Sequence, residues 1–121
     1  MTFHEKLAKI IDKNNSLLSV GFDPVLSKIP SFLKEKDYPF FEFNKAIIDK
    51  TYDLVCAYKF NSAFYEAIGD KGIKELKLTY EYLQKAYPEI PTILDAKRGD
   101  IGSSNEAYAQ YAFDYMQTDS V

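Results

Sequence analysis

Two carboxylates flank a lysine in the segment 95–100 (DAKRGD), and these residue types in this order are suited to proton transfer. Alternation along an extended strand would place Asp95 and Lys97 on the same face. Gly99 would then allow a tight turn that brings Asp100 back toward the same opening. An ammonium group between two carboxylates stays protonated, because nearby opposite charges favour the charged form. Such a lysine is suited to donating a proton and poorly suited to forming a Schiff base.

The same carboxylates would repel an anionic group of a substrate. At about 4 Å and an effective dielectric constant near 20, two unit charges interact by roughly 4 kcal/mol. A substrate carboxylate beside Asp95 or Asp100 would be repelled by an energy of that order, and the repulsion ends when the carboxylate leaves as carbon dioxide. On spacing alone, a surface salt-bridge cluster at the start of a helix explains the segment equally well.

Two further charged residues lie at the ends of short apolar runs. Asp23 follows residues 17–22 (LLSVGF), and Lys59 lies near the end of residues 54–60 (LVCAYKF). In parallel α/β proteins the active site forms at the carboxyl ends of the strands. Because an unpaired buried charge is costly, charges of both signs at this edge predict a mutually paired network. Taken singly, an aspartate before a proline is a common turn, and a lysine at a strand end often extends into solvent.

The elements that would position these residues alternate in kind. Mixed polar residues predict a long loop at 25–38 and a short turn of helix within 61–69. Asn61, Ser62 and Glu66 are expected to cap or brace the loop after the second strand. Arg98 is expected to lie at the surface or at an interface. Asp70 is expected to cap one helix, and Ser103 with Glu106 to form a near capping box on another. Apolar periodicity predicts helices at 3–13, 39–53, 72–87 and about 103–116, strands at 17–22, 54–60 and 91–95, and the start of a fourth strand at 119–121.

This order of elements predicts an α/β fold with a parallel sheet covered by helices. Its repeating β–loop–α units fit a TIM (β/α)8 barrel, a fold of about 250 residues. Residues 1–121 would then form the first three β/α units of a single barrel domain and stop before strand 4. A flavodoxin-like open sheet is the competing arrangement, and three strands would leave it equally unfinished.

The composition bounds the function without naming it. The chain has 121 residues, a formal net charge of −3 and 27% charged residues, which is ordinary for a soluble globular protein. There is no basic patch to favour nucleic acid as a partner, and no apolar run approaches the roughly 20 residues that span a membrane. The start of the chain lacks a secretory signal pattern. A single cysteine, Cys56, cannot form an internal disulfide, so a cytoplasmic setting is expected.

Three blocks of the sequence resemble one enzyme family. LSVGFDP (18–24), YKFNSAFYEAIG (58–69) and LDAKRGDIGSSNEAYA (94–109) are similar to orotidine 5′-phosphate decarboxylase, specifically its longer bacterial branch. The resemblance implies a lyase that converts orotidine 5′-phosphate to UMP in pyrimidine biosynthesis, on a TIM barrel and with neither a metal nor an organic cofactor. It also implies that Lys97 protonates C6 of the pyrimidine and that Asp95 lies beside the substrate carboxylate, holding Lys59 and Lys97 in place.

The resemblance extends to substrate binding and to a partner. Lys59 and Asp23 would bind the ribose hydroxyls. Asp100, Ile101 and Ser104 would enter the active site of the neighbouring subunit, so the complete enzyme would be a homodimer with shared sites. The position of Ser104 is usually threonine in the family, and serine keeps the hydroxyl while losing a methyl contact.

Two other interpretations stay open. A related sugar-phosphate decarboxylase or aldolase on the same scaffold would need magnesium and an acidic ligand near the second strand, where this chain has Lys59. The chain could also be a non-catalytic remnant or fragment. In the family the uracil-binding serine and the phosphate-binding glutamine and arginine come after the position of Val121, so we expect residues 1–121 alone to be inactive, with unpaired edges on the first and third strands.

Overall fold

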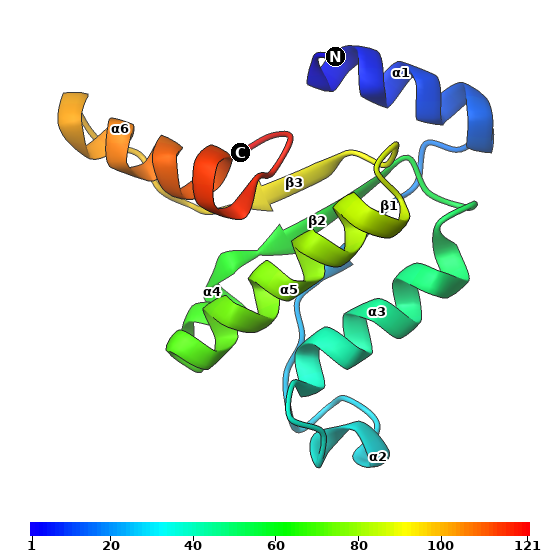
Figure 1. Cartoon of the computed structure of the whole chain (residues 1–121), viewed down its shortest axis with the longest axis vertical. Coiled ribbons are helices and arrows are strands. Elements are labelled where there is room, and N and C mark those ends of the chain that lie inside the picture. The colour runs from blue at the N-terminus through cyan, green and yellow to red at the C-terminus, as the bar shows by residue number, and fades with distance from the viewer.

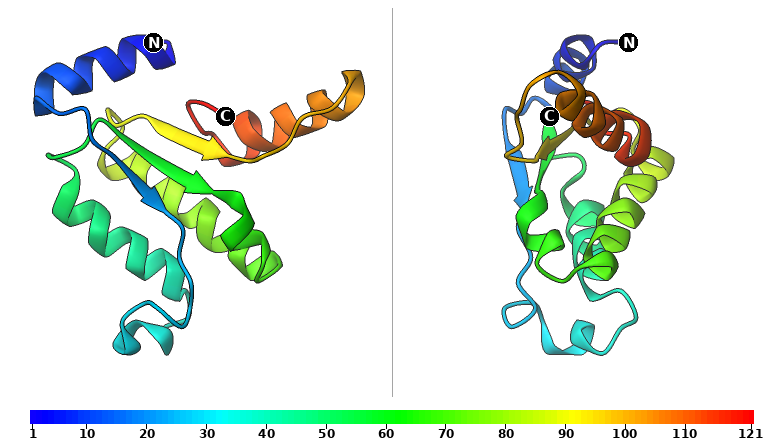
Figure 2. Two further views of the ribbon diagram at one scale, coloured as in Figure 1. Left: turned by 180° about the vertical axis from the view of Figure 1, so that it is seen from behind. Right: turned by 90° about the vertical axis from the view of Figure 1, so that its left-hand side faces the viewer.

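The sheet is parallel, and helices cover one of its faces (Figure 1; Figure 2). The computed structural model describes residues 1–121, and its single sheet has three strands in the order β1-β2-β3. Both pairs of neighbouring strands run parallel, as the alternation of apolar runs and amphipathic segments predicts. The strands are β1 (Ser19–Phe22), β2 (Ala57–Asn61) and β3 (Thr92–Asp95).

The helices follow the predicted ranges, with one addition. A short helix, α2, lies within the stretch predicted to be a loop. No helix combines the length and the apolar character that a membrane crossing needs. The helical segments are α1 (Phe3–Asn14), α2 (Ser31–Lys34), α3 (Pro39–Thr51), α4 (Ser62–Glu66), α5 (Asp70–Ala86), α6 (Gly102–Ala109) and the π-helix η1 (Gln110–Met116).

Alternate residues of each strand face opposite sides of the sheet. Phe22 and Phe60 pair across β1 and β2, and they are 1% and 0% exposed where α3 and α5 cover them. Their neighbours Gly21, Lys59 and Ile93 pair across all three strands on the other face. No helix covers that second face, as the view from behind shows (Figure 2). In a closed barrel this uncovered face becomes the interior.

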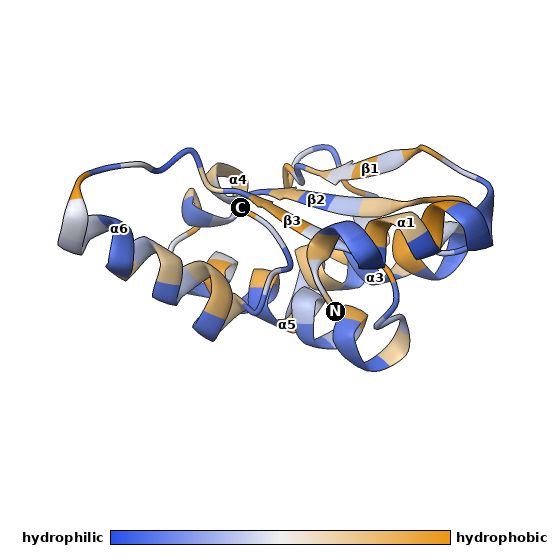
Figure 3. Ribbon diagram, turned by 90° about the horizontal axis from the view of Figure 1, so that it is seen from above, coloured by the Kyte–Doolittle hydropathy of each residue, from blue (hydrophilic) through white to orange (hydrophobic).

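Aromatic side chains form the centre of the core between the sheet and the helices. The ring of Phe60 stacks on Phe22 at 5.2 Å and packs at a tilt on Tyr80 of α5 at 4.8 Å. Leu76, Tyr80 and Leu83 share one face of α5 and are buried, so this helix lies as a layer against the sheet (Figure 3). Burial of each large apolar side chain stabilises the fold by about 1.5–3 kcal/mol.

A buried polar network joins α3, α4 and α5. Asn44 Nδ2 donates to the Tyr65 hydroxyl at 2.8 Å and to Thr79 Oγ1 at 3.2 Å. Glu75 Oε2 accepts the backbone N–H of Phe41 at 2.9 Å, in the first turn of α3. Burial raises the pKa of the Glu75 carboxyl. The network replaces apolar contact with directional bonds and thereby fixes the orientation of three helices.

Two predicted helix caps are wrong. Asp70 is the first residue of α5, and the position before it is Gly69, whose φ of 71° favours a residue without Cβ. At α6 the N-cap is Ile101 and no side chain caps it, so Ser103 and Glu106 form no capping box. The box fails because the helix begins before Ser103, which places both side chains within its turns.

The helix predicted at about 103–116 changes type along its length. Its second part is the π-helix η1, which is followed by Gln117 in the left-handed region at a φ of 62°. The N–H of Thr118 donates to the Ala112 carbonyl at 3.1 Å and closes the end of the helix. Ala112 and Met116 are 1% and 0% exposed, so the wider turns bring them into the core.

The predicted start of a fourth strand pairs with β3. Ser120 forms a parallel bridge with Ile93, and its carbonyl accepts the N–H of Leu94 at 2.8 Å. The preceding Asp119 forms an ion pair with Lys6 of α1 at 2.8 Å. The outer edge of β3 is therefore partly covered. The expectation of an unpaired edge is wrong for β3 and holds for β1, which pairs only with β2.

Candidate active site

Two ammonium groups converge on one carboxylate oxygen at the carboxyl end of β3. Lys97 Nζ lies 2.5 Å from Asp95 Oδ2, and Lys59 Nζ lies 3.5 Å from the same oxygen. Lys59 comes from β2, and Asp95 is the last residue of β3. The predicted network of opposite charges is confirmed for these three side chains.

The register of the sheet explains why Lys59 reaches the uncovered face. Lys59 pairs with Gly21 on β1, which has no side chain to cover the neighbouring ammonium group. A Cβ at Gly21 would lie 4.0 Å from Asp23 Oδ1, so the Asp23 carboxylate lies over this face too. None of the ion pairs in the chain includes Asp23. Asp23 is exposed, so its carboxylate is accessible to another group.

Lys97 contacts Asp95 from outside the strand, so the alternation of side chains along β3 does not explain the contact. β3 ends at Asp95, and Lys97 adopts a left-handed backbone conformation with a φ of 53°. This conformation costs a residue with a Cβ about 1–2 kcal/mol, and such strain is concentrated at functional sites. The role expected for Gly99 is wrong, because the left-handed residues of this loop are Lys97 and Gly102.

The charge of Asp95 is fixed by its lysine partners. The hydrogen bond from Lys97 is the main cause that holds the pKa of the Asp95 carboxyl below its usual range, and the charges of Lys97 and Lys59 add to it. Desolvation acts in the opposite direction and is outweighed. Asp95 is therefore a carboxylate at neutral pH, able to repel a second carboxylate placed beside it.

Asp100 does not return to Lys97 within this chain. Its carboxylate accepts the backbone N–H of Ile101 at 2.7 Å, and its own N–H donates to Asn105 Oδ1 at 2.8 Å. No ion pair of the chain includes Asp100, so the expectation that it flanks Lys97 is wrong for a single chain. Ile101, the N-cap of α6, is 82% exposed, and Ser104 lies in the first turn of that helix.

Several bracing residues lie around the loops after β2 and β3. Asn61 Oδ1 accepts the N–H of Ala63 at 3.2 Å and caps α4, as expected. Arg98 Nη2 donates to Glu66 Oε1 at 2.7 Å and joins the loop after β3 to α4. Asn105 was not anticipated, although its position five residues after Asp100 is that of a side chain able to bind back to a turn.

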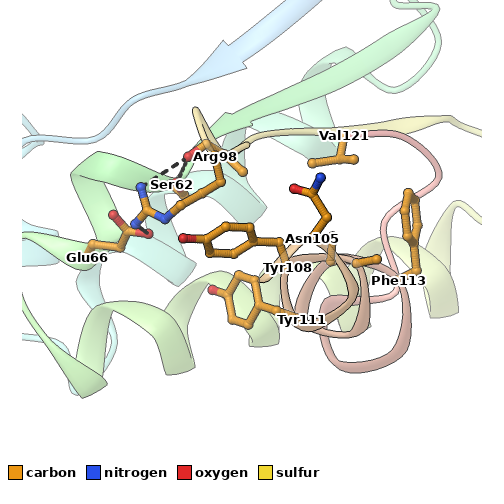
Figure 4. A pocket seen from close by; sticks show the side chains of 11 residues that line it. Ser62, Glu66, Arg98, Asn105, Tyr108, Tyr111, Phe113 and Val121 are labelled. Carbon is orange, nitrogen blue, oxygen red and sulfur yellow. Dashed lines mark hydrogen bonds and ion pairs between the residues drawn. The ribbon is translucent and has the colours of Figure 1, made fainter. Parts of the chain in front are cut away.

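A pocket of about 190 Å³ lies beside this brace and not over the lysines (Figure 4). The lysine cluster lies at the carboxyl end of β2 and β3, and its three side chains line none of the pockets of the chain. No group of three or more His, Cys, Asp and Glu side chains is placed to hold a metal ion. The pocket is lined by Ser62, Glu66, Ala96, Arg98, Asn105, Tyr108, Ala109, Tyr111, Ala112, Phe113 and Val121.

A parallel sheet with one helical layer and a lysine–carboxylate cluster at its carboxyl edge has the arrangement expected of part of an α/β barrel. Residues 17–119 match the model of the orotidine 5′-phosphate decarboxylase / HUMPS family, and the chain belongs to this family.

Curated relatives and solved structures agree with this assignment. The orotidine 5′-phosphate decarboxylase of Flavobacterium johnsoniae is 51% identical over 121 residues, which are 100% of this chain and 44% of the relative. That of Cellvibrio japonicus is 49% identical over 123 residues, with the same shares covered, 100% and 44%. The chain thus spans less than half the length of these relatives.

Two solved structures extend the comparison to the fold. A Toxoplasma gondii structure, described as an orotidine-monophosphate-decarboxylase, has a TM-score of 0.87 at 40% identity, covering 98% of this chain and 39% of that one. The Leishmania donovani OMP decarboxylase has a TM-score of 0.79 at 30% identity, covering 98% and 42%. The three parallel strands therefore correspond to part of a TIM barrel, which confirms the predicted fold class over the flavodoxin-like sheet.

Proposed function

We propose that residues 1–121 form the N-terminal portion of a single orotidine 5′-phosphate decarboxylase barrel domain and carry its proton-transfer residues. The reaction is the decarboxylation of orotidine 5′-phosphate to UMP in de novo pyrimidine biosynthesis. The observation that carries the proposal is the contact of Lys59 and Lys97 with one oxygen of Asp95 at the end of β3. Relatives named for this activity support it.

In the proposed mechanism, Asp95 lies beside the carboxylate of the substrate. The bond between C6 and the carboxylate carbon breaks, carbon dioxide leaves, and the electron pair stays on C6. The Lys97 ammonium stabilises this developing negative charge and then transfers a proton to C6, becoming a neutral amine. The lowered pKa of the Asp95 carboxyl supports the mechanism, because Asp95 must remain charged to repel the substrate carboxylate.

The remaining candidates are proposed to bind the substrate. Lys59 and Asp23, which share the uncovered face, would bind the ribose hydroxyls. Asp100, Ile101 and Ser104 would reach the active site of a second subunit in a homodimer. Two features support the latter role: Asp100 forms no ion pair within its own chain, and Ile101 is 82% exposed.

The uracil and the phosphate of the substrate need contacts beyond these. Phosphate contacts remote from the reacting carbon can lower the barrier as well as increase affinity. Because the chain spans 44% of the length of its relative, residues 1–121 alone are proposed to be inactive. The setting is proposed to be the cytoplasm, in keeping with a free cysteine, Cys56, that has no partner for a disulfide.

The proposal is tested with a hybrid enzyme, in which residues 1–121 replace the matching 44% of the Flavobacterium johnsoniae relative. The hybrid is expected to convert orotidine 5′-phosphate to UMP, followed by ultraviolet absorbance. The unaltered relative serves as the positive control. A folded hybrid without turnover, beside an active relative, would contradict the proposal, because the substituted segment contains all of the proposed proton-transfer residues.

A further inference from the structure

The loop that carries Lys97 is fastened to α4 on both sides of that residue. After Lys97, Arg98 Nη2 donates to Glu66 Oε1 at 2.7 Å. Before it, the Ala96 carbonyl accepts from Ser62 Oγ at 3.5 Å and from Arg98 Nη1 at 3.5 Å. Figure 4 shows Arg98 extended between Glu66 and the start of α4. We call Ser62, Glu66 and Arg98 the loop clamp.

Lys97 needs such support because its own interactions are insufficient to fix its backbone. Its φ of 53° is unfavourable for a residue with a Cβ. Its ion pair with Asp95 is formed by a side chain that is 59% exposed, and exposed ion pairs contribute little to stability. Relaxation of this loop to an ordinary conformation would therefore withdraw the ammonium group from Asp95 at little cost.

The loop clamp also has the right connections to set the geometry of the cluster. α4 begins directly after β2, the strand that carries Lys59, whereas Arg98 follows β3, the strand that ends at Asp95. Ser62 is 2% exposed, so its hydroxyl is held by the core. The planar guanidinium of Arg98 contacts two acceptors at once, which fixes direction as well as distance.

We propose that Ser62, Glu66 and Arg98 are positioning residues that hold Lys97 against Asp95 for proton transfer. The inference rests on the proposed role of Lys97 as proton donor. None of the three touches the reacting atoms. They act through the loop, and a displacement of about 1 Å at a reacting group is enough to lower a rate by roughly a hundredfold.

The test uses Arg98→Ala and Glu66→Gln in the hybrid enzyme. Each is expected to lower kcat by about 10- to 100-fold with KM changed by less than about threefold, because proton transfer is affected and the main substrate contacts are elsewhere. If the loop clamp acts as a unit, adding Glu66→Gln to Arg98→Ala should cause little further loss. Lys13→Ala is the matched control, since Lys13 forms an exposed ion pair with Glu89 at 2.8 Å, far from the cluster.

A second measurement does not depend on activity. NMR titration of the Asp95 carboxyl in the hybrid should give a higher pKa in Arg98→Ala than in the unaltered hybrid, because Lys97 would move away, and no change in Lys13→Ala. An Asp95 titration unaffected by Arg98→Ala would overturn the inference, whatever the activity. A kcat of Arg98→Ala within twofold of that of the unaltered hybrid would also overturn the inference. A loss of kcat accompanied by lower UMP affinity and a lower melting temperature would overturn it too, because that pattern indicates a general structural defect. An inactive unaltered hybrid would count against the proposed function, and the titration would still decide the loop clamp.

Discussion

At the scale of single residues, the candidate site consists of two lysine ammonium groups that contact the same aspartate carboxylate. Lys59 and Lys97 both contact Asp95 Oδ2, so neither is neutralised by a carboxylate of its own. The net charge of these three side chains is positive, which in the proposed reaction would favour an anionic substrate and the negative charge that develops as carbon dioxide leaves. In the proposed mechanism, Asp95 repels the substrate carboxylate and keeps both cations in place.

Lys97→Ala in the hybrid enzyme is expected to abolish UMP formation without unfolding the protein. The variant removes the proposed proton donor, whereas a side chain that is 59% exposed contributes little to the core. Turnover of orotidine 5′-phosphate and the melting temperature should be measured on the same preparation. Near-normal turnover in Lys97→Ala would rule out the mechanism proposed here.

Activity of the hybrid is expected to be unaffected by EDTA. Lys59 and Lys97 already supply the positive charge that a metal ion would bring to a carbanion. Turnover is measured before and after chelation, and again after addition of magnesium. Loss of activity that magnesium restores would transfer the assignment to the sugar-phosphate decarboxylase or aldolase branch.

Residue types and strand ends were enough to predict that Lys59, Asp95 and Lys97 meet, whereas Asp23 and Asp100, predicted in the same network, form no ion pair. The pairing of Lys59 with Asp95 follows from two strand ends at one edge of a parallel sheet. The left-handed conformation of Lys97 was not predictable, because a lysine gives no local signal for positive φ. The position of Asp100 was predicted wrongly for a related reason, since Asn105 holds its loop and the spacing does not reveal that bond.

At the scale of elements, the helical layer is oriented by the buried network around Asn44. Asn44 binds both Tyr65 and Thr79, and the Tyr65 hydroxyl in turn donates to the Phe22 carbonyl at 3.4 Å. Phe22 immediately precedes Asp23 at the end of β1. The network therefore connects the packing of α3 and α5 to the edge of the sheet where the candidate site lies.

Asn44→Ala in the hybrid is expected to lower the free energy of unfolding by about 1–3 kcal/mol, because buried partners lose their hydrogen bonds. Asn44 is 0% exposed, so water cannot replace the amide without entering the core. Urea unfolding gives the measurement. Gln84→Ala is the control, since Gln84 makes one exposed hydrogen bond to Gln117 and should change stability by less than about 0.5 kcal/mol. Equal effects of the two variants would contradict the role of the network.

Element types were predictable, and element ends were less so. Apolar periodicity places α1, α3, α5 and all three strands, because burial of one face dominates their stability. The predictions of a cap at Asp70 and of a capping box at Ser103 are wrong because each helix begins earlier than expected. Gly69 is the N-cap of α5, and Ile101 is the N-cap of α6. The change to a π-helix at η1 has no signature in the sequence, and its wider turns bring Met116 into the core.

At the scale of the whole molecule, the uncovered face of the sheet dominates the behaviour expected of residues 1–121. In a barrel, strands on the opposite side would fill the space against Ile93 and Gly21. The outer edge of β1 also has hydrogen-bonding groups without a neighbouring strand. Both features favour association with other polypeptide segments.

Residues 1–121 expressed alone are therefore expected to associate and to lack decarboxylation activity. Each exposed large apolar side chain forgoes about 1.5–3 kcal/mol of burial, against a total stability of about 5–15 kcal/mol for a whole domain. Oligomeric state, cooperativity of unfolding and turnover are the measurements. A monomer with a sharp melting transition and measurable turnover would refute this expectation.

The proposed sharing of active sites between two subunits predicts complementation between inactive variants. Asp100→Asn and Lys97→Ala hybrids should each be nearly inactive alone. After free subunit exchange, the mixture should recover about a quarter of the unaltered activity, because half of the dimers are mixed and each has one intact site. The absence of any recovery, when exchange is verified by mass labelling, would argue against placing Asp100 in the neighbouring site.

The ion pair between Lys6 and Asp119 has a consequence for folding kinetics. Its partners are 113 residues apart, whereas the β1–β2 and β2–β3 pairings each close a much shorter loop. Contacts between distant residues carry the larger loop-closure entropy and are expected to form late. Formation of this ion pair, which joins α1 to Asp119, would then be among the last steps of folding. A pair of fluorescent labels beside these two residues would report completion of folding rather than its initiation.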